Sequence, residues 1–166
     1  VAATPGQERV ILGRQLERRI NTVTTTSMGR LFDAVSSLCD VCHEAGYEGQ
    51  AAIEVESILD ASETGSYEIP IDGGVWETSG LIAAVVADLR AGTTPGFVAA
   101  RFHRAIADAM VRAAEELRSE HGLAVVGLSG GVFQNLTLTR MAVDALTLRG
   151  FDVLTHRLVP PNDGGL

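Results

Sequence analysis

The sequence contains no lysine: all 13 of its basic residues are arginine. A P-loop lysine, a lysine that forms a Schiff base and a lysine that is adenylated as an intermediate all need an amine on a flexible stem. These three chemistries are therefore excluded for the chain. Any phosphate that it binds must be held by backbone amides, arginine or a metal ion.

Positive charge is also scarce, because 21 acidic residues against 13 arginines leave a formal net charge of −8. Nucleic acids bind to clustered positive charge, so we expect no nucleic-acid partner. Although 46% of the residues are hydrophobic, no run of about 18 apolar residues is present, and we expect no membrane span. These properties predict a globular protein, for which we expect a cytoplasmic location.

Cysteine is rare, and the only two cysteines form a Cys-x-x-Cys pair at Cys39 and Cys42. A thioredoxin-like redox pair would open a helix, whereas this pair falls inside a helical pattern. A structural zinc site would need two further ligands at matching spacing. His43 is adjacent, but no other residue completes a set of four ligands. We therefore expect two thiols that pack on or beside a helix.

The chain has 166 residues, begins with Val1 and stops just after an Asn-Asp-Gly-Gly stretch. We expect a fragment truncated at both ends, with a mainly helical segment over 1–65 and an α/β lobe over 66–166. Hydrophobic periodicity and glycine or proline stops predict the elements. The expected helices are Arg9–Ile20, Arg30–Ala45, Ala51–Ala61, Ser79–Arg90, Pro95–His121 and Leu136–Leu148, and the expected strands are Ser66–Asp72, Leu123–Leu128 and Phe151–Thr155.

The stretch Ala124–Asn135 is typical of a buried strand, a glycine turn and the start of a helix. Gly130 and Gly131 let a ligand approach the backbone closely, and the first helical amides would then face an anion such as a nucleotide phosphate. An ordinary tight turn gives the same pattern. Asn135 has the side chain either to cap the helix or to reach a ribose or phosphate, and the spacing leaves both roles open.

A second glycine loop surrounds Asp163, after the last expected strand. Because ligands in α/β sheets bind beyond the carboxyl ends of the strands, we expect both loops to lie at one edge. A carboxylate there suits a divalent metal or an oriented water, although an Asn-Asp-Gly turn is a common structural feature. The histidines suggest no catalytic set: His103 is expected at the surface or partly buried, and His121 and His156 lack a partner nearby in sequence.

Five motifs taken together resemble the C-terminal part of the HypF-type carbamoyltransferases, which mature nickel-iron hydrogenases. They are Thr26–Ala34, Tyr47–Glu54, Ala100–His103, Leu128–Asn135 and Pro160–Leu166. They occur in the order of the family and extend from about residue 24 to the last residue. The resemblance implies most of the second lobe of an actin-like, sugar-kinase-like ATPase fold, related to the tRNA threonylcarbamoyl transferases.

The resemblance also implies a reaction. Proteins of this family use carbamoyl phosphate and ATP to make carbamoyl adenylate in a separate domain, and pass the carbamoyl group to the C-terminal cysteine of HypE. The thiocarboxamide becomes the cyanide ligand of the hydrogenase iron. The expected cofactors are the ATP or AMP moiety of carbamoyl adenylate and a divalent metal (Fe, Zn or Mg). The family's metal-binding histidines lie upstream of this chain, so we do not expect the fragment alone to be active.

The site residues follow from the same resemblance. The pocket for the nucleotide or carbamoyl adenylate would be lined by Asp33, Glu48, Gly49, Gln50, Ser129, Gly130, Gly131 and Asn135, and Asp163 would bind the metal. The residues alone leave simpler roles open. Asp33 could face water or make an i,i+4 contact on its helix, and Glu48–Gln50 could cap the helix that begins at Ala51. The alternative functions are an O-carbamoyltransferase that acts on a small-molecule hydroxyl and a non-catalytic lobe that docks a partner.

Overall fold

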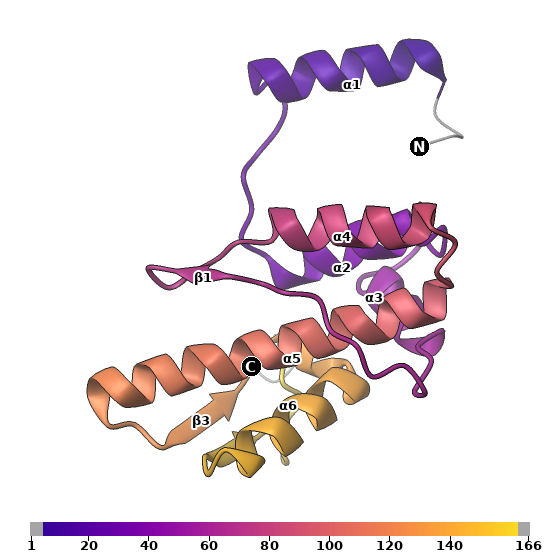
Figure 1. Ribbon diagram of the computed structural model, residues 1–166. Helices are drawn as coiled ribbons and strands as arrows, with labels where there is room; N and C mark the ends of the chain where they lie inside the picture. The colour runs from indigo at the N-terminus through magenta and orange to yellow at the C-terminus, as the bar shows by residue number, and fades with distance from the viewer. Residues whose placement is uncertain (1–4, 163–166) are drawn as a thin grey trace.

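The computed structural model describes residues 5–162, which form a mainly helical body with two small sheets (Figure 1). The helices are α1 (Gly6–Arg18), α2 (Met28–Leu38), α3 (Gln50–Ser57), α4 (Ser79–Arg90), α5 (Pro95–His121) and α6 (Leu136–Leu148), with a 3₁₀-helix, η1 (Gly131–Gln134). The strands are β1 (Ile71–Asp72), β2 (Val75–Trp76), β3 (Val125–Leu128) and β4 (Asp152–Thr155). Among residues 5–162, no helix has the length and apolar composition that crossing a membrane requires.

The 27-residue helix α5 is the longest element, and its two ends follow the sequence prediction. The Thr94 hydroxyl accepts a hydrogen bond from the Phe97 amide, and Pro95 occupies the first helical turn, where a missing N–H costs nothing. Gly122 ends the helix with φ +69°, a left-handed conformation that glycine adopts without strain. Many residues of α5 are fully buried, because α3, α4 and α6 pack against this helix.

Two hydrophobic cores share α5. The larger core combines α2, α3, α4 and the N-terminal half of α5, with Phe32, Phe102, Ile106 and Leu81 fully buried. The smaller core lies where α5 and α6 pack on β3 and β4, and it contains Val111, Ala142, Leu146 and Phe151. The long helix therefore packs on the sheet, as the sequence predicts.

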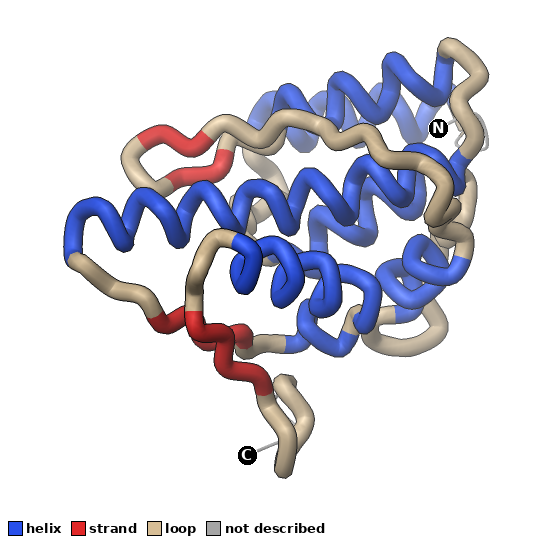
Figure 2. The backbone as a smooth tube through the Cα atoms, turned by 60° about the horizontal axis from the view of Figure 1, so that its bottom comes forward, coloured by secondary structure: helices blue, strands red, loops and turns tan. Residues whose placement is uncertain are grey.

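Strands β3 and β4 pair in parallel, and α6 forms the crossover between them (Figure 2). Val125 is opposite Asp152 and Leu128 is opposite Thr155, so both strands end at the same edge. This confirms the predicted strand-helix-strand unit. The strands are shorter than expected, because β3 begins at Val125 and β4 at Asp152.

The expected strand Ser66–Asp72 is largely wrong, because only Ile71 and Asp72 pair. They form a hairpin with Val75–Trp76 across the Gly73–Gly74 turn. The preceding residues belong to no strand and are held by side chains instead. The Ser66 hydroxyl donates to Asp108 at 2.7 Å, and Arg112 donates to the Ile69 carbonyl at 2.7 Å. Segment 66–70 is thus tied to α5 rather than to a sheet edge.

The expected helix Arg30–Ala45 is too long at its C-terminal end, since α2 stops at Leu38. Asp40 adopts φ +59°, its amide donates to the Ser37 carbonyl, and the Val41 amide donates to the Ser36 carbonyl. This is the Schellman arrangement with Asp in the position usually held by glycine. Likewise α3 ends at Ser57 rather than at Ala61, since residues 58–60 leave the helix to approach α5.

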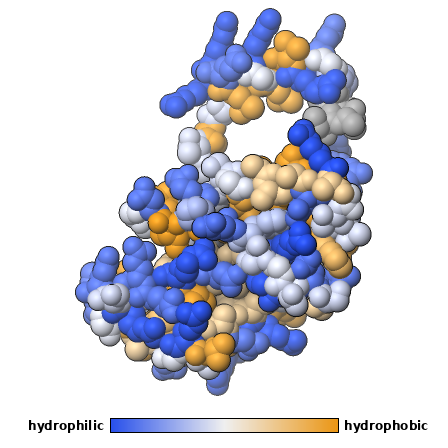
Figure 3. All heavy atoms as spheres, viewed as in Figure 1, coloured by the Kyte–Doolittle hydropathy of each residue, from blue (hydrophilic) through white to orange (hydrophobic). Residues whose placement is uncertain are grey.

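Helix α1 confirms the predicted N-terminal helix but buries none of its residues. Val10, Ile11, Leu12 and Leu16 are each at least half exposed. Figures 1 and 3 show α1 apart from the body, with hydrophobic atoms on its surface. The rest of the fold is therefore built without it.

Candidate functional site

Two loops meet at the edge where β3 and β4 end. The amide of Gly130 donates a hydrogen bond to the carbonyl of Pro161 at 2.8 Å, and the Ser129 hydroxyl lies 3.0 Å from Nε2 of His156. The prediction that both glycine loops share one sheet edge is confirmed as far as residue 162. Asp163 itself lies outside the described residues.

The loop after β3 is open toward solvent and tightly folded. Gly130 has φ +109°, which an L side chain rarely adopts, and a Cβ on Gly131 would come within 3.9 Å of Asn162 Cβ. The loop continues as η1 rather than passing directly into α6, which corrects the predicted turn. Within residues 5–162, no acceptor bonds to the amides of Gly131 and Val132, so these two donors are available to a ligand.

The start of α6 is occupied by the chain itself. The Leu138 amide donates to Oδ1 of Asn135 at 2.8 Å, and the Thr137 amide donates to a carboxylate oxygen of Glu56 at 2.7 Å. A carboxylate at a helix N-terminus is favoured by the helix dipole. The expectation that the first helical amides face a ligand is therefore wrong at these two positions, since Glu56 of α3 is the anion there.

Asn135 also binds a fully buried histidine. Nδ2 of Asn135 lies 2.8 Å from Nε2 of His103, and Nδ1 of His103 lies 2.7 Å from the Ala99 carbonyl. Because a carbonyl can only accept, Nδ1 carries the proton and Nε2 accepts from Asn135. The helix-capping role left open for Asn135 is thus observed, and its contact with a ribose or phosphate stays a prediction.

The expectation that His103 is exposed or partly buried is wrong. Its side chain is 0% exposed and packs edge-on against the rings of Phe32 and Phe102, with centroid distances of 5.3 and 5.9 Å. Burial lowers the pKa of His103, so the imidazole is neutral near pH 7. A neutral, enclosed imidazole holds Asn135 in place and is not placed to act as a general base.

The predicted pocket residues on α2 and around the start of α3 lie outward. Asp33 pairs with Arg30 at 3.0 Å and keeps 41% of its side chain exposed. Glu48 is exposed, and Gly49 precedes α3 as its N-cap residue, with φ +79° and no side-chain cap. Gln50 accepts from the Gly46 amide and donates to Glu54, both at 2.7 Å. Among the described residues, no hydrogen bond joins this group to the loop after β3.

The two cysteines are free and buried, as expected for packed thiols. Burial raises the pKa of the Cys39 thiol to about 11. Burial is also the main reason that the pKa of Cys42 is raised, with the carboxylates of Glu54 and Asp33 adding to the effect. A thiol with a raised pKa is a poor nucleophile and a poor metal ligand at neutral pH.

Three contacts at this site join residues that are far apart in the sequence. His103 and Asn135 are 32 residues apart, Glu56 and Thr137 are 81 apart, and Ser129 and His156 are 27 apart. Neither helical nor strand periodicity relates residues at such separations. The packing of α3 and α5 beside the strand-helix-strand unit brings the first two pairs together, whereas the parallel pairing of β3 and β4 places Ser129 beside His156.

Residues 1–166 match the family described as "Carbamoyltransferase, Kae1-like Domain, second subdomain". The chain belongs to this carbamoyltransferase family. The match covers the whole chain, so α1 to β4 and both loops at the sheet edge fall inside the family's subdomain.

Curated relatives of this carbamoyltransferase subdomain carry the same family name. The chain is 37% identical over 158 residues to "Carbamoyltransferase HypF" of Rhodobacter capsulatus, covering 93% of this chain and 20% of that protein. It is 33% identical over 163 residues to the protein of that name from Synechocystis sp., covering 92% and 20%. It is 30% identical to "Probable carbamoyltransferase HypF" of Methanocaldococcus jannaschii, covering 96% and 21%. The chain therefore spans about a fifth of these relatives' length.

Solved structures agree on the fold. The carbamoyltransferase subdomain superimposes with a TM-score of 0.91 and 38% identity on "full-length HypF in the phosphate- and nucleotide-bound form", covering 98% of this chain and 22% of that one. It superimposes with a TM-score of 0.85 and 29% identity on HypF of T. kodakarensis, covering 95% and 21%. The α/β fold therefore matches that of the corresponding part of HypF structures.

Three polar groups at the sheet edge have no hydrogen-bond partner among residues 5–162. Besides the amides of Gly131 and Val132, Oδ1 of Asn162 is buried without a hydrogen-bond partner among the described residues. An acceptor buried in this way calls for a donor or a cation. Residues 5–162 contain no group of three His, Cys, Asp or Glu side chains able to hold a metal ion. The described residues of the carbamoyltransferase subdomain therefore do not make a metal site by themselves.

Proposed function

We propose that this chain is the nucleotide-facing part of a HypF-type carbamoyltransferase, within the second lobe of an actin-like, sugar-kinase-like ATPase fold. The complete protein would transfer the carbamoyl group of carbamoyl adenylate, made from carbamoyl phosphate and ATP, to the C-terminal cysteine of HypE. The observation that carries the proposal is the sheet edge, where the Gly130–Pro161 bond joins two loops beside open backbone amides.

In the proposed reaction, the cysteine sulfur forms a bond to the carbamoyl carbon and the bond from that carbon to the AMP phosphate oxygen breaks. The thiol proton leaves to solvent or a base, and AMP departs with the electron pair. Negative charge develops on the carbonyl oxygen and on the departing phosphate. Fixed amide donors such as those of Gly131 and Val132 would stabilise that charge more than they stabilise the reactant.

The remaining predicted residues have supporting roles in this proposal. Ser129 would bind the phosphate beside these amides, and Asn135 would fix the end of the loop while capping α6. Asp33, Glu48, Gly49 and Gln50 would form the wall that binds the nucleoside, since their side chains or backbone remain accessible. We propose Asp163 as a ligand of a divalent metal, which would supply Lewis-acid stabilisation of the phosphate when bound.

The test uses the full-length protein with purified HypE, ATP and carbamoyl phosphate, and mass spectrometry of the C-terminal cysteine of HypE. We expect a carbamoyl mass increment on that cysteine. Asp163→Ala should abolish it and Ser129→Ala should reduce it severalfold. Asp144→Ala is the matched control, because Asp144 is exposed on α6 and the charge change equals that of Asp163→Ala.

The possible outcomes test the assignment of the site residues separately from the proposed transfer reaction. If HypE is modified equally by the parent and both variants, the transfer reaction stands but the site residues are wrong. If HypE is never modified while a hydroxyl compound is carbamoylated, the small-molecule O-carbamoyltransferase is correct. If nucleotide has no effect on the full-length protein in any assay, the subdomain serves only to dock a partner.

A further inference from the structure

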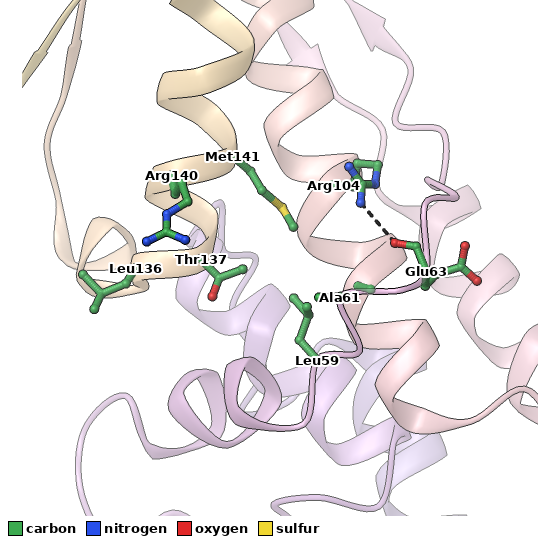
Figure 4. A pocket seen from close by; sticks show the side chains of 9 residues that line it. Leu59, Ala61, Glu63, Arg104, Leu136, Thr137, Arg140 and Met141 are labelled. Carbon is green, nitrogen blue, oxygen red and sulfur yellow. Dashed lines mark hydrogen bonds between the residues drawn. The ribbon is translucent and has the colours of Figure 1, made fainter.

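A pocket of about 300 Å³ lies between α5, α6 and residues 59–63 (Figure 4). This volume is at the lower end of the range for small-molecule sites. None of its lining residues belongs to the predicted nucleotide-binding set. The pocket and the loops at the sheet edge are therefore formed by different residues.

Most of the pocket wall is apolar. Leu59 and Ala61 come from the segment that follows α3, Ala100 comes from α5, and Leu136 and Met141 come from α6. Figure 4 shows the Met141 side chain extending across the pocket between α6 and α5. An occupant with a hydrocarbon body would remove this apolar surface from water.

Two arginines flank the apolar wall on opposite sides (Figure 4). Arg104 of α5 donates to the Glu63 carbonyl at 3.1 Å, and its Nε is buried with no hydrogen-bond partner in the described part of the chain. Arg140 of α6 is exposed and makes no hydrogen bond or ion pair with residues 5–162. Neither guanidinium group forms an ion pair with residues 5–162.

The carboxylates of Glu63 and Glu56, which lie near the pocket, bond to groups other than these two arginines. Glu63 accepts from Arg101 at 2.8 and 3.1 Å and from the Gly65 amide at 2.6 Å, and the bond from Gly65 is the main reason that its pKa is lowered. Glu56 accepts from the Thr137 amide. Among residues 5–162, neither Arg104 nor Arg140 therefore forms an ion pair with a carboxylate.

From the two unpaired guanidinium groups and the apolar wall, we propose that this pocket binds a small organic carboxylate with an apolar body. Guanidinium forks match carboxylate oxygens in geometry and charge. The Thr137 hydroxyl lines the same pocket and adds a neutral donor. The arginines would repel a cation. A bare inorganic anion would leave the apolar surface of the pocket exposed to water.

The probes are hexanoate, hexylamine and acetate, which separate charge from apolar body. They are titrated into the 166-residue chain and followed by ¹H–¹⁵N NMR at the amides of Leu136, Thr137 and Arg140 and at Nε–H of Arg104. We expect saturable shifts with hexanoate, at a dissociation constant on the order of 1 mM. Hexylamine should cause none, and acetate should bind at least fivefold more weakly.

Variants then assign the binding to the arginines. Arg140→Ala should weaken hexanoate binding about tenfold, whereas Arg90→Ala, an equal charge change at the exposed end of α4, should leave binding unchanged. Ala61→Leu fills the pocket from an exposed position and should also abolish binding. Arg104→Lys keeps the charge but loses the fork, and should give an intermediate affinity.

The proposal is overturned if hexylamine and hexanoate shift the same amides equally, because the pocket would then recognise only hydrocarbon. It is also overturned if Arg140→Ala and Arg90→Ala bind hexanoate alike, or if no probe shifts these amides. These readouts need neither HypE nor carbamoyl phosphate, so the result is independent of the proposed transfer reaction.

Discussion

The starts of α6 and α3 are both predicted nucleotide-binding segments, yet they are built in opposite ways. Asn135 before α6 is 7% exposed and is fixed by Leu138 on one side and His103 on the other. Gly49 before α3 has no side-chain cap and its neighbour Glu48 is exposed. The first segment is a rigid part of the core, whereas the second is a surface turn.

This difference separates stability from binding. A helix start with buried caps keeps the loop before it in one geometry, which is the preorganisation that charge stabilisation requires. A surface turn can adjust to a ligand without disturbing the core. Changes around Asn135 should therefore act mainly through folding, and changes around Gln50 mainly through ligand affinity.

The largest effect is expected for His103→Ala. The change opens a cavity between Phe32 and Phe102 and removes the partners of the Ala99 carbonyl and of Nδ2 of Asn135. We expect a loss of about 4 kcal/mol in the free energy of unfolding. Urea denaturation followed by circular dichroism measures it. A loss below about 1 kcal/mol would show that the rigid segment does not depend on the histidine.

Asn135→Ala should destabilise the chain less, by about 2 kcal/mol, through loss of the α6 cap and of the bond to His103. Asn135→Ser is the informative companion, because serine still caps a helix but is too short to replace the contact with His103. We expect about half the loss for the serine variant. Equal losses in both variants would place all of the effect on the histidine bond.

The free energy of unfolding should also fall as the pH is lowered through a defined range. Burial lowers the pKa of His103 below the ordinary value of 6.5, and Glu56 is the carboxylate that opposes this shift. The unfolded chain therefore takes up the proton first, so stability is complete above pH 6.5 and is lost as the pH falls toward the folded pKa. The slope should approach about 1.4 kcal/mol per pH unit.

The control for this pH dependence is His121→Gln, which changes an exposed histidine at the end of α5. Between pH 6.5 and 5, this variant should keep the slope of the parent, whereas His103→Gln should flatten it. An unchanged slope in His103→Gln would assign the acid sensitivity to other groups. The carboxylates of Glu63 and Asp88, with lowered pKa values, act at lower pH.

The smallest effects belong to the surface turn. Gly49→Ala should cost about 1 kcal/mol, because φ is +79° although nothing lies within 4 Å of the added Cβ. Gln50→Ala should cost less than about 0.5 kcal/mol, since its hydrogen bonds stay at the surface. Isothermal titration of the full-length protein with ATP should nevertheless show weaker binding for Gln50→Ala. Unchanged affinity would remove Gln50 from the proposed nucleoside wall.

The sequence was sufficient for the elements whose signals are local. Thr94, Pro95 and Gly122 mark the ends of α5, and the glycine pair marks the loop after β3. The predicted C-terminal end of α2 was wrong because Asp40 adopts the left-handed conformation there. The first strand was predicted too long because side chains of α5, rather than strand pairing, hold residues 66–70. The capping roles of Glu56 and His103 depend on tertiary packing, which local patterns do not contain.

The two cores meet along one helix, and that has a consequence for how the chain opens. Phe102 and Ile106 of α5 belong to the larger core, and Val111 and Ala114, one to three turns further on, belong to the smaller one. Neither core can come apart without freeing a face of the same continuous helix. Amide protons in the middle of α5 should therefore exchange only in global unfolding, while those of α1, which enters neither core, exchange almost freely.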